Sequence, residues 1–496
     1  MKTLVNEMRV KSPSHRFIPV LASLLLVFSA SAASEETLPL KSVNKANEVI
    51  DAALEAHGGA ENLAELNSVV QESEFVNYAN GQSRRPGPPW DRSQQTTFNV
   101  IDFENDVFVV RQAGSGGGFD FNGGTIINGE NGWQLDIRGG TATPIAEPDF
   151  NTTSGPFIRV TAPLLMKQLQ SRRQVSHWLG EVEYDGRPHD VVTLVMEVGP
   201  GLSLYFDQAS HLLTRMERVL PPFGQVEYRF GDYEPVDGVL FNKSFHLLLN
   251  GDANLDVTNV STRVNVPVEQ YAKVDDALKM TDPVQPDDFN LQEIDEGVFL
   301  VGGNGAYGLL VEMEDHIVAV GGTQGVKARL DEVRKHIADK PVRYGVLTHH
   351  HSDHVPGAAE YAKEGATIIT FPANEQVVRN AAGQDDIKLQ FVEDRMTLSD
   401  GERTVELIDI GPTPHAEQLL VAWLPEEKIL FEADHFPQPR SGVIPPAVPA
   451  TLAFAKALER EKINPQKIVG AHSPVIGSPA DLTTALRSTV ASTGAL

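Results

Sequence analysis

The chain has 496 residues, of which 41% are hydrophobic and 22% are charged, so it is long enough for more than one globular domain. Its formal net charge is -26 at pH 7, and such an acidic surface repels phosphate backbones, which argues against a nucleic-acid partner. The absence of cysteine excludes disulfides, a lipid-attachment cysteine and any cysteine metal ligand.

The N-terminal segment has the layout of a secretory signal. Four basic residues precede the apolar run from Phe17 to Phe28, and the small residues Ala30-Ser31-Ala32 follow it. We expect cleavage after Ala32 and export to a bacterial periplasm or exterior. Loss of residues 1–32 removes those four basic residues and Glu7, so the formal charge becomes about -29. No later run is long and apolar enough for a bilayer span, so we expect no stable membrane insertion after cleavage.

Residues 33–280 are predicted to form a β-rich domain with a few helices. A helix is expected from Ala46 to His57, where Gly58-Gly59 stops it, and a second helix over residues 163–171. Period-two alternation of apolar and polar residues predicts an antiparallel meander between and after them. The strands are expected over residues 69–78, 96–102, 107–112, 191–198, 202–206, 212–219, 225–230 and 239–248.

Two features of this half bear on ligands. The hairpin turns at Asp207 and Asp237, with the opening helix, resemble periplasmic lipoprotein-carrier domains, and this resemblance implies an apolar ligand in a groove of the sheet. Two segments rich in glycine or proline, residues 84–90 and 114–118, interrupt the strands. We expect both to be surface loops rather than a lid over a substrate.

Residues 281–290 are rich in proline and acidic residues, and they predict a linker to a second domain over residues 291–496. That domain should begin with strands over residues 298–301, 307–313 and 316–320, followed by a helix over residues 325–338. A strand over residues 342–347 comes next, and strands and helices alternate to a closing helix over residues 480–488.

The sequence Thr348-His349-His350-His351-Ser352-Asp353-His354 follows the strand over residues 342–347, at the end where open α/β sheets place their sites. In an extended segment His349 and His351 project to the same side and can share one ion. Asp353 and His354, where the chain begins to coil, reach a second ion beside it. This spacing predicts a binuclear metal centre, with His350 pointing away from the ions.

Three more candidate ligands follow in order, each beside an apolar strand: His415, Asp434 and His472. Together with the pattern His-X-His-X-Asp-His, they resemble the metallo-β-lactamase superfamily of binuclear metal hydrolases. This resemblance implies a four-layered αββα sandwich preceded by the β-rich domain. It also implies a first metal on His349, His351 and His415, a second on Asp353, His354 and His472, and a bridge between them through Asp434.

The chemistry implied by the resemblance is hydrolysis. A hydroxide shared by two divalent ions attacks a small carbonyl substrate with an ester-like bond, which is a lactone, ester, thioester or lactam. Asp353 is expected to orient the hydroxide and pass on its proton. Zinc is the expected metal, although manganese and iron suit the same ligands. The bridging Asp434 favours the glyoxalase II and lactonase type over true β-lactamases.

Two other functions remain open. One is a mononuclear iron oxygenase of the same fold, against which the full second site argues. The other is a lipid-binding protein whose hydrolase domain is inactive.

The chain departs from the superfamily pattern after the third strand, where Ala319-Val320-Gly321-Gly322-Thr323 lacks the usual aspartate that supports the metal loop. Val355-Pro356-Gly357 likewise replaces the usual paired glycine. His435 is either a proton donor on the substrate side or a packing residue. Tyr307 is expected in the core rather than at an oxyanion.

Overall fold

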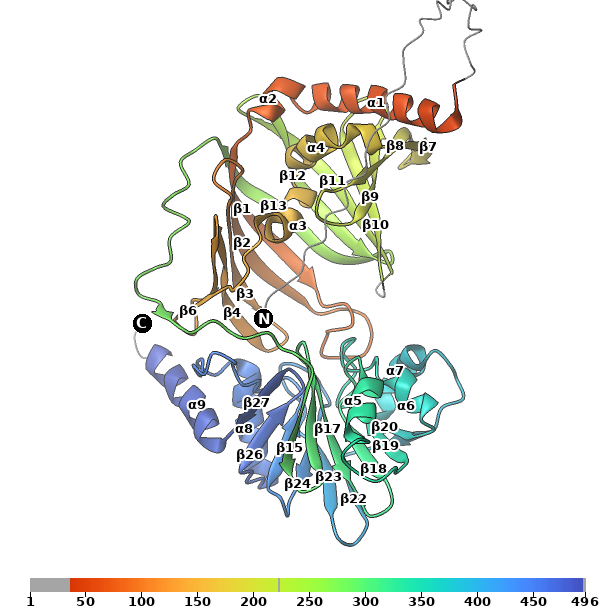
Figure 1. The fold of residues 1–496 in the computed structure, drawn as a ribbon, viewed down its shortest axis with the longest axis vertical. Helices are drawn as coiled ribbons and strands as arrows, with labels where there is room; N and C mark the ends of the chain where they lie inside the picture. Colours follow the sequence, from red (N-terminus) through yellow and green to blue (C-terminus); the bar gives the residue numbers. More distant parts are fainter. Residues whose placement is uncertain (1–35, 222–223, 494–496) are drawn as a thin grey trace, which may run out of the picture.

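The structure is a computed structural model that describes residues 36–221 and 224–493 (Figure 1). The expected signal segment and its cleavage site at Ala32 lie outside these residues. A large curved sheet from the N-terminal region (residues 36–280) occupies one end of the molecule. The C-terminal region (residues 290–493) occupies the other end. Among the described residues, no helix combines the length and apolar character that a membrane crossing requires.

One 14-stranded sheet dominates the N-terminal region, with the strand order β14-β6-β5-β4-β3-β2-β1-β13-β12-β11-β10-β9-β8-β7. Its strands are β1 (Ser68–Tyr78), β2 (Arg92–Asp102), β3 (Val107–Gly116), β4 (Phe119–Asn128), β5 (Asn131–Asp136), β6 (Thr141–Pro144), β7 (Trp178–Tyr184), β8 (Arg187–Val195), β9 (Gly201–Asp207), β10 (Leu213–Leu220), β11 (Gly224–Val236), β12 (Val239–Leu249), β13 (Asp252–Val264) and β14 (Lys279–Met280). β13 returns to pair with β1, so the first strand lies in the middle of the sheet.

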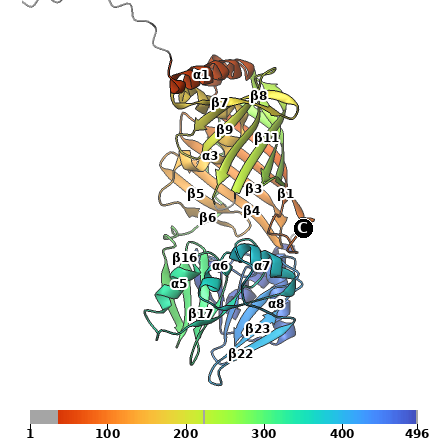
Figure 2. The ribbon, with the colours of Figure 1, turned by 90° about the vertical axis from the view of Figure 1, so that its right-hand side faces the viewer.

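The helices α1 (Leu38–Ala56), α2 (Ala60–Ala64), α3 (Phe150–Val160) and α4 (Ala162–Ser171) lie along the curved sheet (Figure 1), and Figure 2 shows α1 and α3 from the side. The buried residues of α1 are Ala46, Val49, Ile50, Ala53 and Leu54, which is the i, i+3, i+4, i+7 spacing of one helix face. They join a core cluster with α4 and the inner face of strands β8 to β12. The apolar residues whose spacing predicted this helix are therefore the same residues that pack it against the sheet.

The predicted β-rich character of this half is confirmed, but its strand list was incomplete. β4, β5, β6, β7 and β13 were missed, because glycine and polar residues obscure their alternation, and the two-residue β14 was missed as well. The prediction of a loop over residues 114–118 was wrong, since β3 continues to Gly116 and only Gly117 and Gly118 form the turn. Glycine suits this strand because the side chains of Gln95 and Ser93, from the neighbouring strand β2, occupy the space beside Gly114 and Gly116.

Two further sheets make up the C-terminal region. The first has the order β15-β16-β17-β18-β19-β20-β21 and the second the order β22-β23-β24-β25-β26-β27. The strands are β15 (Asn290–Asp295), β16 (Val298–Gly303), β17 (Ala306–Glu312), β18 (Ile317–Val320), β19 (Val342–Val346), β20 (Thr367–Thr370), β21 (Leu389–Phe391), β22 (Arg395–Ser399), β23 (Thr404–Asp409), β24 (Leu420–Leu424), β25 (Ile429–Glu432), β26 (Lys467–Gly470) and β27 (Ser473–Gly477). The helices are α5 (Val326–Val333), α6 (Ala358–Lys363), α7 (Glu375–Ala382), α8 (Pro449–Glu461) and α9 (Pro479–Thr493).

Three apolar clusters organise these elements. One contains residues of both sheets, including Leu309, Ile369, Leu407 and Phe431. A second joins the first sheet to α5, α6 and α7, and the third joins the second sheet to α8 and α9. α5 ends at Val333, five residues before the predicted end at residue 338. The bounds predicted for the domains are not tested by these clusters and stay predictions.

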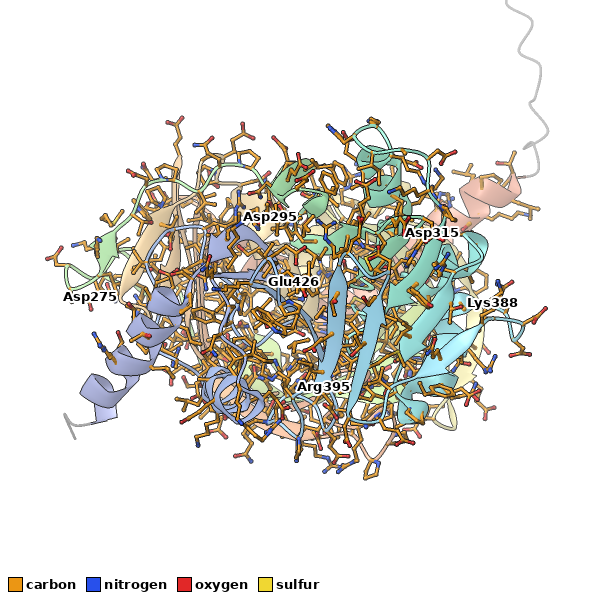
Figure 3. All side chains as sticks on the ribbon, turned by 90° about the horizontal axis from the view of Figure 1, so that it is seen from below. Asp275, Asp295, Asp315, Lys388, Arg395 and Glu426 are labelled. Atoms are coloured by element: carbon orange, nitrogen blue, oxygen red, sulfur yellow. The ribbon has the colours of Figure 1, made fainter. Side chains whose placement is uncertain are left out.

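The two ends of the C-terminal region differ in what they face. Arg395 of β22 and Glu426 of the turn before β25 lie at the end away from the N-terminal sheet, and the view from that end shows them (Figure 3). The loops that follow β19, β23 and β25 lie at the opposite end, because their residues contact the N-terminal region. His472, after β26, lies at the same end beside His354. The candidate ligands are therefore found at the junction of the two regions.

Candidate metal centre

Each candidate ligand follows a strand closely. The loop after β19 carries His349 to His354, and Asp434 and His472 come two residues after β25 and β26. His415 lies in the loop after β23. Because β19, β25 and β26 run in parallel with a neighbour, their carboxyl ends can gather residues distant in sequence at one edge. All seven candidate ligands meet there, in two adjoining groups.

The first group consists of His349, His351 and His415, with ligand atoms within 4.8 Å of one another. The Nε2 atoms of His349 and His415 are 3.3 Å apart. All three side chains are almost fully buried. Bonds of ~2.0–2.1 Å from a tetrahedral Zn²⁺ to imidazole nitrogens place those nitrogens ~3.3 Å apart, so the group has the spacing of a metal site.

The second group consists of Asp353, His354, Asp434 and His472, again within 4.8 Å. The Nε2 atoms of His354 and His472 are 3.0 Å apart, and Asp353 Oδ2 lies 3.4 Å from the first and 3.6 Å from the second. The side chains of Asp353 and His472 are 48% and 30% exposed. This group is therefore the more open of the two, and solvent or a substrate reaches it from outside.

Asp434 lies between the groups and turns one oxygen to each. Its Oδ2 is 3.4 Å from His349 Nε2 and 3.3 Å from His415 Nε2. Its Oδ1 is 3.1 Å from His354 Nε2 and 2.9 Å from His472 Nε2. A single carboxylate placed in this way can ligate one cation through each oxygen.

The hydrogen bonds of the imidazoles fit metal binding. His415 Nδ1 donates to Gly117 O at 2.9 Å and His472 Nδ1 donates to Gly305 O at 2.8 Å, so each residue turns its Nε2 toward the other candidate ligands. His351 is held the other way round, because its Nε2 donates to Ser83 O at 3.0 Å. Its buried Nδ1 has no hydrogen-bond partner, and neither does His354 Nδ1. A ligating imidazole needs one nitrogen fixed and the other free, and His351, His415 and His472 meet this condition, whereas no hydrogen bond fixes His354 Nδ1.

Electrostatics separate the two groups. Burial, reinforced by the neighbouring histidines, holds the pKa of His349 well below its usual value and lowers the pKa of His351 to about 3. Burial also acts against a charge on His354, but Asp434 and Asp353 outweigh it and raise its pKa to about 10. His349 and His351 of the first group are thus neutral imidazoles, and the second group holds the carboxylates that attract positive charge.

The segment between β1 and β2 packs directly on the metal loop. Ser83 O accepts from both His350 Nε2, at 2.8 Å, and His351 Nε2, while Gly81 O accepts from Ser352 N at 2.9 Å. Gln82 Nε2 donates to Asp353 Oδ1 at 2.7 Å. Residues 84–90 form an irregular segment with no buried residue, as expected for a surface loop. Arg84 joins this loop to the C-terminal region, because its O accepts from the Glu417 backbone amide and its Nε donates to Thr413 O at 3.1 Å.

The turn between β3 and β4 makes the second contact. Gly117 O holds His415, Gly118 O accepts from Ala450 N at 2.9 Å, and the Phe119 ring meets the His415 ring edge-on at 5.3 Å. Sequence reasoning missed all of these residues. Most of them act through backbone carbonyl oxygens, which any residue type provides. Gly117 also lies some 300 positions before His415 in the sequence.

The remaining candidates lie outside both groups. His350 bonds to Ser83 and belongs to neither group. His435 is buried and its Nε2 lies 3.1 Å from Thr413 Oγ1, which favours the packing interpretation. Tyr307 is fully buried and its hydroxyl donates to Asp287 Oδ1 at 2.5 Å, as expected for a core residue.

The strand end that lacks the usual aspartate supports the metal loop through its backbone. Gly322 O accepts from Gly357 N at 2.7 Å. A Cβ at Gly322 would lie 2.1 Å from His354 O, so no side chain fits there. Close backbone contact thus takes the place of a side-chain carboxylate.

Comparison with known proteins agrees with this site. The family model of the metallo-beta-lactamase superfamily matches residues 301–472. A curated relative, the 2,4-dinitroanisole O-demethylase subunit alpha of Nocardioides sp. (strain JS1661), is 28% identical over 116 residues, which is 23% of this chain. The match spans 35% of the length of that relative.

Solved structures are similar to part of the chain. The metallo-beta-lactamase from Pontibacter korlensis is 20% identical, with a TM-score of 0.33, over 41% of this chain and 99% of its own. The rubredoxin oxygen:oxidoreductase of Desulfovibrio gigas is 21% identical, with a TM-score of 0.34, over 41% and 61%. The family match supports the metallo-β-lactamase superfamily for residues 301–472 of the chain, and members of this superfamily bind divalent metals.

Proposed function

We propose that this protein is an exported, binuclear metal-dependent hydrolase of small carbonyl substrates. The observation that carries the proposal is the position of Asp434, whose two oxygens face two complete groups of ligands. A site built for one ion has no need of a second set of ligands. Export is proposed from the signal-like first 32 residues.

In this proposal His349, His351 and His415 hold one cation, and Asp353, His354 and His472 hold the other. When bound, the two cations would polarise a carbonyl and lower the pKa of a water from 15.7 to about 7, which supplies a nucleophile at neutral pH. We propose zinc, and manganese and iron have the same ligand preferences.

The chain itself positions the reactants. Asp353 is the most exposed candidate ligand, and Gln82 fixes one of its oxygens, so the other can orient a water and receive its proton. Its own pKa lies well below the ordinary value: burial raises it, but hydrogen bonding and charge from His354 and the bond from Gln82 lower it more. Asp353 is therefore a carboxylate, as an acceptor must be. His472, partly exposed beside it, borders the space for the substrate.

The oxygenase alternative requires one iron, whereas two equivalents of metal per chain would support the hydrolase. The inactive-domain alternative predicts no turnover at all. Both are addressed by one experiment on the metal-loaded mature protein. Metal content is measured by elemental analysis, and hydrolysis is followed on aryl esters, lactones, thioesters and β-lactams, and on 2,4-dinitroanisole because the relative is named for that compound.

We expect two metals per chain and turnover of at least one ester-like substrate that chelator abolishes and added metal restores. Asp353→Ala should lose turnover, while Asp394→Ala, a carboxylate outside both groups, should retain it. One iron per chain, or equal turnover in the Asp353→Ala variant, would contradict the proposal.

A further inference from the structure

A small cavity opens beside the candidate metal centre, on the N-terminal sheet. Its volume is 220 Å³, and its lining includes Gln82, Ser93, Gln95, Phe119, Phe121 and His415. It lies below the 300–1,000 Å³ usual for drug-sized ligands, and at ~30 Å³ per molecule it holds about seven waters. The cavity therefore suits part of a small molecule.

Strand register explains why the sheet is hollow here. Gly114 lies opposite Phe121 on one side and Gln95 on the other, and Gly116 lies opposite Phe119. Side chains in these rows share a face of the sheet, and the two glycines contribute none. A Cβ at Gly116 would lie 3.0 Å from Ser93 Oγ, so the depression closes if a side chain is added.

Two of the lining residues connect the cavity to the metal centre. His415 belongs to the first group of ligands and lines the cavity directly. Gln82 lines it as well, and its amide nitrogen donates to Asp353 Oδ1 in the second group. A substrate whose carbonyl lies at the metal centre can therefore extend its acyl group into the cavity.

The lining indicates what this group is. Phe119 and Phe121 form an apolar wall, and Asn77, Gln82, Gln95 and Ser93 offer neutral hydrogen-bonding groups. Two charged residues also line the cavity: Asp91 accepts from Arg84 N at 2.8 Å, and the exposed Arg92 has its guanidinium over the Tyr78 ring at 4.8 Å. Beside the phenylalanine wall the cavity thus offers mainly apolar contact and neutral hydrogen-bonding groups.

We propose that this cavity is the acyl pocket of the hydrolase and that it selects a compact, uncharged, flat apolar group, such as an aryl ring. The proposal rests on the proposed function for the position of the carbonyl. In this proposal the N-terminal sheet determines substrate specificity, and the C-terminal region supplies the metal ligands.

The test compares binding of two carboxylates, which are products of ester hydrolysis, to the metal-loaded full-length protein. The probes are 4-fluorophenylacetate and fluoroacetate, and dissociation constants are measured by ¹⁹F NMR. Wild type should bind the aryl probe about tenfold more tightly, because the ring buries apolar surface. Phe121→Ala and Gly116→Ala should each remove most of this preference while leaving the metal content unchanged.

Phe98→Ala is the matched control, since Phe98 lies on the other face of the same sheet, against Tyr271, with ring centroids 5.2 Å apart. It should keep the wild-type preference. No preference in wild type, an unchanged preference in both pocket variants, or an equal loss in the Phe98→Ala control would each overturn the proposal. Binding that responds to the pocket variants in a protein without turnover would retain the pocket and reject the hydrolase, so the two failures are distinguishable.

Discussion

The turn between β3 and β4, formed by Gly117 and Gly118, contacts His415 and allows a test of how strongly the N-terminal region affects metal binding. We consider Gly118→Leu, because Gly118 has a φ of +85° and a Cβ there would lie 3.1 Å from Pro414 Cβ and 3.2 Å from Ala450 Cβ. Carbon atoms prefer ~3.5–4.0 Å, so the leucine must push the turn away from the His415 loop. Gly117 O then moves off His415 Nδ1, from which it now lies 2.9 Å.

The expected cost is a loss of metal affinity. Removal of a partner that orients a ligating histidine weakens metal binding by roughly 10–100-fold, which is about 1.4–2.7 kcal/mol. The left-handed backbone conformation adds about 1–2 kcal/mol of strain to any non-glycine residue, and this penalty lowers stability wherever the substitution is made.

Gly129→Leu separates the two effects. Gly129 also turns a hairpin of the same sheet, with a φ of +57°, but nothing lies within 4 Å of its added Cβ. Both variants should lose similar thermal stability, and only Gly118→Leu should lose metal affinity. The assay is zinc competition against a chromogenic chelator. Equal affinities in the two variants would refute the link between the turn and the metal centre.

Three further predictions concern single side chains. Asp434→Ala should lower the metal content of dialysed protein from two ions to fewer than one, by elemental analysis, because both groups lose an oxygen. Gln82→Ala should lower kcat about tenfold and shift its acidic pH limb while metal content stays at two, since Gln82 positions Asp353 without ligating. Burial lowers the pKa of His57 to about 4 from 6.5, so the folded protein binds fewer protons than the unfolded chain between these values. The free energy of unfolding is therefore unaffected by His57 above pH 6.5 and decreases by about 3 kcal/mol as the pH drops to 4. Denaturant titrations of His57→Gln should show a correspondingly weaker loss, and an identical pH dependence would contradict the pKa shift.

The candidate ligands could be found from sequence because they depend on short-range order. His349, His351, Asp353 and His354 lie within six residues, and His415, Asp434 and His472 each follow an apolar strand. Each of these residues can be recognised from its residue type and from the few positions around it. The structure brings these residues together, and their metal roles remain a prediction that the metal analysis addresses.

The rest of the site could not be found in this way. Ser83 and Gly117 act through backbone carbonyls, for which any residue type would serve, and nothing local connects them to histidines some 270 to 300 positions away. Residues 114–118 have the composition of a flexible loop, but three of them belong to a strand that is packed by its neighbours. The cavity depends on how β3 pairs with β2 and β4, and the glycines of β3 carry no apolar–polar alternation from which that register could be predicted.

The shared carbonyl of Ser83 has a consequence for recombination among such chains. His350 and His351 both donate to it, and a carbonyl oxygen with two lone pairs can serve both only while the segment after β1 stays in place. A catalytic half transplanted without its original β-rich partner would keep every ligand yet lose this acceptor and the wall of the acyl pocket together. Exchange of the N-terminal half should therefore change substrate selectivity and metal affinity together. The two regions are thus expected to be inherited as a pair rather than recombined independently.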